Sequence, residues 1–83
     1  MENFVIKNKF GSINGDWLYI EFFSAGAYYY AYWEVEWDNF KISIYEDRGL
    51  ENNPQLTSMV SNKTSDIESL MLEAIDTFCV LDI

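Results

Sequence analysis

The feature that most constrains the fold is that every second side chain is apolar in each of the strand-like runs within residues 17–46, whereas the side chains between them are mostly aromatic rings and carboxylates. Successive side chains of a β-strand point to opposite faces, so each turn fixes which residues of two neighbouring strands share a face. A hairpin around Ala25-Gly26 and a second one at Asp38-Asn39 both place the apolar residues of their strands on one common face of the sheet. The predicted apolar face consists of Leu18, Ile20, Phe22, Ala31, Trp33, Val35, Trp37, Phe40, Ile42 and Ile44. Agreement between two separate turns predicts an antiparallel sheet with one buried face.

Four strands are expected, each bounded by turn-prone residues. They span residues 4–10, 17–23, 28–37 and 40–46. In the first of the two hairpins, Ile20 is expected to lie opposite Ala31. In the second, Val35 is expected opposite Ile42, and Glu36 opposite Lys41 as an attractive pair of charges.

The first strand fits this pattern less well. A two-residue turn at Asn14-Gly15 would place both lysines of the strand on the core face. A three-residue loop with a β-bulge instead places Phe10 opposite Ile20 and turns Lys9 towards Glu21. We prefer the bulge, because it keeps the lysines out of the core.

The chain after residue 64 has the periodicity of an amphipathic helix. Ser65 and Glu68 have the spacing of a capping box, and Asp66 adds negative charge where the helix dipole is positive. The apolar stripe of this helix is Ile67, Leu70, Met71, Ala74, Ile75 and Phe78. Residues 54–60 before it are expected to form a short helix or an irregular arm.

These elements predict one α+β domain over residues 1–83, in which a four-stranded antiparallel meander carries one C-terminal helix on one face (ββββα). The start of the chain lacks the basic and apolar regions of a secretory signal, and no apolar run is long enough to cross a bilayer. We therefore expect a cytoplasmic protein.

Composition excludes several functions. Fourteen acidic and five basic residues give a formal charge of −9, which argues against direct binding to nucleic acid or to anionic membranes. The chain has no histidine and one cysteine, Cys79, which excludes disulfide scaffolds, histidine-ligated metals and Ser-His-Asp chemistry. No catalytic motif, cofactor motif or metal-binding spacing is present, so we expect a non-enzymatic protein without metal or cofactor, in which Cys79 is a packed apolar residue.

The second face of the sheet has unusual side chains. Its aromatic residues, with Phe23 among them, are bordered by carboxylates, and one helix cannot cover both faces. The predicted partner-binding residues are Trp17, Tyr19, Glu21, Tyr28, Tyr30, Tyr32, Glu34, Glu36 and Asp38. Exposed aromatic patches mark interaction sites, and a row of carboxylates beside planar rings can imitate a nucleic-acid strand. The alternatives are that residues 49–63 cover part of this face, and that the carboxylates only keep the protein soluble.

The leading hypothesis is an acidic inhibitor that docks this face onto the basic, nucleic-acid-binding groove of a protein partner. Such a protein would act as a nucleic-acid mimic, in the manner of anti-CRISPR or anti-restriction proteins. One alternative is an immunity protein or antitoxin that neutralises a nuclease toxin. Another is a structural module that forms a homodimer or larger homo-oligomer through the tyrosine-rich face.

Overall fold

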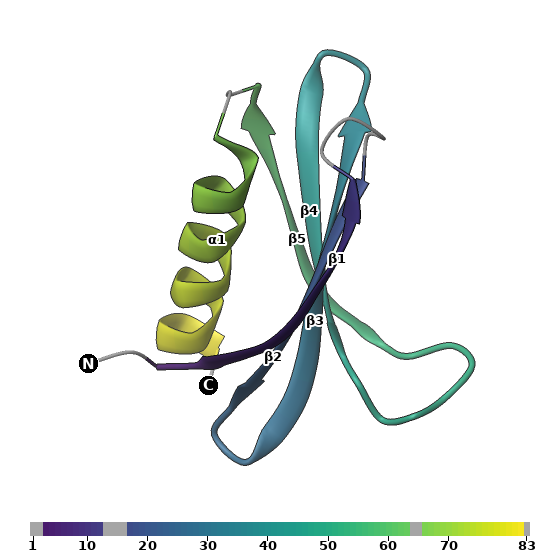
Figure 1. Cartoon of the computed structure of the whole chain (residues 1–83), viewed down its shortest axis with the longest axis vertical. Coiled ribbons are helices and arrows are strands. Elements are labelled where there is room, and N and C mark those ends of the chain that lie inside the picture. The colour runs from purple at the N-terminus through teal and green to yellow at the C-terminus, as the bar shows by residue number, and fades with distance from the viewer. Residues whose placement is uncertain (1–2, 13–16, 64–65, 83) are drawn as a thin grey trace.

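The computed structural model describes residues 3–12, 17–63 and 66–82, which form a five-stranded antiparallel sheet and one helix. The strands follow one another in the sheet in chain order. The elements are β1 (Val5–Ser12), β2 (Trp17–Ser24), β3 (Ala27–Glu36), β4 (Asn39–Glu46), β5 (Gln55–Asn62) and α1 (Ile67–Asp82). Figure 1 shows α1 along one face of the sheet, whereas the β4–β5 loop projects away from the helix.

The core lies between α1 and the sheet. The predicted helix stripe is buried there, except for the partly buried Leu70, and it packs against the predicted apolar face. That face is itself buried except for Val35 and Trp37. Cys79 is buried beside the stripe, as predicted, and burial raises the pKa of its thiol. Removing these apolar surfaces from water is the main stabilising contribution that the helix makes to the fold.

The prediction of four strands was wrong, because residues 55–62 form a fifth strand and neither a helix nor an irregular arm. Leu56, Met59 and Val60 have a helix-like spacing, but serine, threonine and asparagine around them are poor helix formers. β5 pairs with the open edge of β4, which satisfies backbone groups that would otherwise lack partners. The segment therefore widens the sheet and does not cover its second face as a layer.

The β2–β3 hairpin has the predicted register, with Ile20 opposite Ala31. Ala25 and Gly26 both have positive φ, at 49° and 83°. A two-residue type I′ turn needs positive φ at both central positions, and its twist matches that of the strands.

The β3–β4 hairpin has a register that differs from the predicted one by two residues. Its turn residues are Trp37 and Asp38, so that Trp33 lies opposite Ile42 and Glu34 opposite Lys41. A shift of two residues leaves every paired side chain on its predicted face, because strand side chains repeat every two residues. Trp37 is the exception, since it has left the strand: its φ is 57° and it is 90% exposed.

The predicted position of the β1 bulge was wrong. The bulge lies between Ile6 and Asn8, within the strand, and Lys9 is opposite Ile20 whereas Phe10 is opposite Tyr19. Ile6 thus reaches the core, and Phe10 joins the second face of the sheet. The Asn14-Gly15 turn lies outside the described residues.

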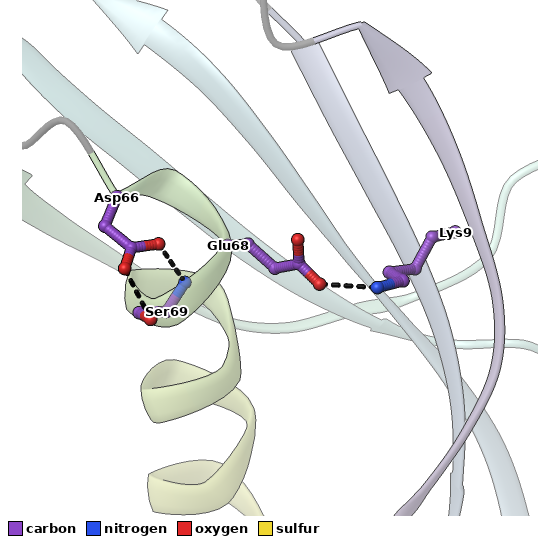
Figure 2. A network of polar contacts seen from close by, with 4 residues as sticks. All are labelled: Lys9, Asp66, Glu68 and Ser69. Carbon is purple, nitrogen blue, oxygen red and sulfur yellow. Dashed lines mark hydrogen bonds and ion pairs between the residues drawn. The ribbon is translucent and has the colours of Figure 1, made fainter.

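Lys9 lies on the helix side of the sheet but is not buried. Its ammonium group forms an ion pair with Glu68 in the first turn of α1, where both side chains remain partly exposed (Figure 2). The helix is capped by Asp66, whose carboxylate accepts hydrogen bonds from Ser69 N at 3.0 Å and Ser69 Oγ at 2.8 Å. Both hydrogen bonds stabilise the ionised carboxylate and so lower the pKa of Asp66, and the bond from the Ser69 backbone has the larger effect. The predicted capping box involves Ser65, which lies outside the described residues.

Candidate functional site

The sheet face opposite α1 carries a row of aromatic rings that crosses four strands. Phe10 of β1 lies 5.8 Å from Tyr19 of β2, between ring centroids, and Tyr19 stacks on Tyr30 of β3 at 4.8 Å. Tyr30 in turn stacks on Tyr45 of β4 at 4.8 Å. Neighbouring strands hold these rings in contact because cross-strand and diagonal side chains are within reach of one another. The stacking fixes the positions of these rings relative to one another, so the row is preorganised; because Tyr19, Tyr30 and Tyr45 stack on one another through their faces, the row turns ring edges outward.

The strand registers place most of the predicted partner-binding residues on this same face. Trp17 lies opposite Glu34, Tyr19 opposite Tyr32, Glu21 opposite Tyr30, and Phe23 opposite Tyr28. We call the aromatic face the surface formed by Phe10, Trp17, Tyr19, Glu21, Phe23, Tyr28, Tyr30, Tyr32, Glu34, Glu36 and Tyr45.

The rings of the aromatic face remain accessible to solvent. Trp17 is 41% exposed and Tyr28 is 53% exposed, whereas the tyrosines in the middle of the row are half-buried. The half-burial of Tyr30 follows from its contacts with the rings on either side. Within the described residues, α1 packs on the other side of the sheet, and residues 51–53 of the β4–β5 loop lie beside Tyr30, Tyr32 and Tyr45. The helix therefore leaves the aromatic face uncovered, and the loop flanks one part of it.

Carboxylates border the aromatic face along β3. Glu34 is half-buried and Glu36 is exposed, and Lys41 lies opposite Glu34 with its Nζ 3.6 Å from Glu36 Oε2. This lysine partly neutralises the acidic row. Asp38 lies in the β3–β4 turn, where the strand repeat that was expected to align it with the two glutamates has ended. The predicted row therefore comprises Glu34 and Glu36, with Asp38 at the exposed tip of the hairpin.

Burial and neighbouring negative charge on the aromatic face both disfavour ionisation of Tyr19. Burial, followed by the charge of Glu21 and smaller effects of Tyr30 and Asp47, raises the pKa of Tyr19 to about 12. Glu21 is held in place by Asn8, whose Nδ2 donates a hydrogen bond to Glu21 Oε1 at 3.2 Å.

A hollow of about 320 Å³ lies at the edge of the aromatic face, between Tyr30, Tyr32 and Tyr45 on one side and residues 51–53 of the β4–β5 loop on the other. The sequence leaves open that residues 49–63 cover part of this face, and residues 51–53 of that segment do lie beside it. The hollow itself was not predicted, because its shape depends on how the loop folds. Tyr45 and Phe10 were also absent from the predicted partner-binding residues. Tyr45 could have been found by extending the strand alternation from Ile44, and Phe10 by accepting the rejected Asn14-Gly15 turn.

Trp37 is a further exposed aromatic residue, at the tip of the β3–β4 hairpin. The strand pattern predicts that Trp37 lies in the core, whereas its indole is almost wholly in water. Its backbone has a positive φ that residues other than glycine, asparagine and aspartate rarely adopt. An exposed tryptophan in such a conformation, next to Glu36 and Asp38, has the character of an interface anchor.

Among the described residues, no three histidine, cysteine, aspartate or glutamate side chains are grouped so that they could hold a metal ion. No helix in this part of the chain combines the length and apolar character needed to cross a membrane. Comparisons of the chain with protein-family models, curated proteins and solved structures find no match.

Proposed function

We propose that this chain is a non-enzymatic, acidic binding protein of the cytoplasm that docks its aromatic face onto a basic groove of a protein partner. The groove is one that normally binds nucleic acid, and the docked chain inhibits the partner by occupying it, as a nucleic-acid mimic of the anti-CRISPR or anti-restriction kind does. The observation that carries this proposal is the open row of stacked rings with carboxylates on its border.

Two physical features support a basic partner. Proteins that bind single-stranded nucleic acid combine a positively charged groove with surfaces on which bases stack. The aromatic face offers such a groove a row of aromatic rings together with negative charge, on a chain with a formal charge of −9. Complementary potentials accelerate the encounter, and tyrosine and tryptophan supply most of the binding energy once the rings are desolvated.

The test compares two variants of equal charge. Glu34→Gln with Glu36→Gln removes two charges from the aromatic face, and Glu73→Gln with Asp76→Asn removes two from α1, on the other side of the sheet, where both residues are exposed. The tagged chain is used to isolate its partner from the native host, and the affinity of the purified partner is then measured at low and high salt.

We expect the Glu34/Glu36 variant to bind at least about tenfold more weakly and with a reduced salt dependence, and the Glu73/Asp76 variant to bind like the unmodified chain. Nucleic acid should compete for the same partner. Equal weakening by both variants, or a partner whose nucleic-acid binding is unaffected, would contradict the proposal. A nuclease toxin as the partner would favour the immunity-protein alternative, and a chain that binds only its own copies would favour the assembly alternative.

A further inference from the structure

The hollow beside the aromatic face has the composition of a site for an organic cation. Three tyrosine rings line its sheet side, and the loop side consists of Glu51, Asn52 and Asn53. A cation placed over the face of an aromatic ring is attracted by the ring quadrupole. Tyr30 is stacked on Tyr19 and on Tyr45, which leaves Tyr32 and Tyr45 to make such a contact. The carboxylate of Glu51 on the opposite wall adds charge and hydrogen-bond acceptors. The volume of the hollow, about 320 Å³, is at the lower end for ligand sites, which suits one long side chain.

The loop wall of the hollow is held by its own hydrogen bonds. Asn53 Oδ1 accepts bonds from Arg48 N at 3.0 Å and from Leu50 N at 3.2 Å, and Asp47 Oδ1 accepts one from Gly49 N at 3.0 Å. Asp47 N also donates to the backbone oxygen of Tyr28 at 2.9 Å, which ties the loop to β3. The wall is thus formed before a ligand arrives, which reduces the entropy lost on binding.

The cationic groups nearest to the loop in sequence do not line the hollow. Arg48 pairs with Glu46, from Nη2 to Oε2 at 2.9 Å, and it is absent from the lining. Glu51 is exposed and carries the charge of the lining. The hollow therefore presents negative charge and π-electron density to a ligand from outside.

We propose that this hollow is a cage for the guanidinium group of an arginine side chain on the basic partner. Arginine is favoured over lysine because its guanidinium is planar, stacks on aromatic rings, donates in a fork to a carboxylate and is more weakly hydrated. This inference rests on the proposed function for the identity of the partner, but the cage itself is tested without that partner.

The experiment titrates the chain with capped arginine (N-acetyl-L-arginine methylamide) and follows the backbone amide resonances by NMR. Capped citrulline, which replaces the guanidinium by a neutral urea of the same shape, is the matched ligand, and capped lysine tests the need for a planar cation. The variants are Glu51→Gln, Tyr45→Leu and the ring-preserving Tyr45→Phe, with Glu73→Gln on α1 as the control. Retained resonance dispersion shows that each variant is folded.

Capped arginine is expected to bind in the millimolar range, as a small ligand should, and to shift the resonances of residues 51–53. Glu51→Gln and Tyr45→Leu should each weaken it by about fivefold or more, whereas Tyr45→Phe and Glu73→Gln leave it unchanged. Lysine should bind more weakly, and citrulline weakest of all.

Equal binding of citrulline and arginine, shifts away from the loop, absence of binding, or indifference to Glu51→Gln would overturn the cage. Such a result would leave the proposed function standing if capture of the partner still depended on Glu34 and Glu36. Conversely, the hollow could bind capped arginine while the Glu34/Glu36 variant binds the partner as tightly as the unmodified chain does. That result would contradict only the proposed function.

Discussion

Truncation of the two tryptophans of the β3–β4 hairpin, Trp33 and Trp37, should destabilise the fold to very different extents. Trp33 is 1% exposed and packs edge-on against Phe40 at 5.1 Å between ring centroids, so Trp33→Ala should cost about 3–5 kcal/mol of unfolding free energy. Trp37 is 90% exposed. With about a tenth of a surface of 150–250 Å² buried, Trp37→Ala should cost about 0.5 kcal/mol. Trp37→Gly should be at least as stable as Trp37→Ala, since glycine adopts a positive φ without strain.

The assay is urea unfolding followed by circular dichroism. A small domain has only about 5–15 kcal/mol of stability, so Trp33→Ala can leave the chain unfolded in water. Trp33→Phe, which keeps a ring in the core, then supplies an intermediate loss. Similar losses for Trp33→Ala and Trp37→Ala would refute the observed turn. They would show that the hairpin turns at Asp38-Asn39 and that both indoles face the core.

Three further substitutions probe the edge strand, the helix cap and the acidic row. Gly11→Ala should cost about 1–3 kcal/mol in thermal or urea unfolding, because φ is 126° there and a Cβ would lie 2.7 Å from the backbone oxygen of Trp17. Asp66→Ala should lower the urea midpoint at neutral pH. Because the folded state lowers the pKa of Asp66, that loss should shrink as pH falls through the carboxyl range. Lys41→Met should strengthen binding to the basic partner several-fold, since it removes the cation beside Glu36, while stability changes by about 1 kcal/mol or less.

Each of these substitutions has a matched control. Gly49→Ala also places alanine at a positive φ but meets no atoms, so it should cost less than Gly11→Ala. Asp66→Asn keeps a capping side chain and should remove most of the pH dependence. Lys63→Met makes the same change of charge outside the aromatic face and should leave affinity unchanged. Equal effects of any substitution and its control would contradict the corresponding explanation.

Local rules were sufficient for the centre of the fold. The β2–β3 register followed from two turn residues, and the helix stripe followed from its spacing, because in both cases the decisive contacts are short-range. The predicted β3–β4 register was wrong by two residues, but each paired side chain still lies on its predicted face. This is because strand side chains return to the same face every two residues. For this reason the predicted partner-binding residues of β2 and β3 lie together on one face.

Features that depend on the rest of the fold could not be predicted. β5 lacks the clear alternation of apolar and polar residues that indicates a strand, and it becomes a strand because β4 offers it an open edge. The β1 bulge lies at its observed position because it lets Ile6 reach the core, while Lys9 meets a glutamate of a helix that is distant in sequence. The hollow needs a loop to fold beside the tyrosines. No local pattern encodes any of these arrangements.

The most direct test of the proposed binding surface is hydroxyl-radical footprinting of the chain, free and bound to its partner. In the free chain the exposed rings of Trp17, Tyr28 and Trp37 should be oxidised readily. In the complex they should be protected, whereas the exposed Val80 and Leu81 at the end of α1 should react as before. Protection of the helix end with unchanged oxidation of the three rings would contradict the account, because the partner would then be bound on the opposite side of the molecule.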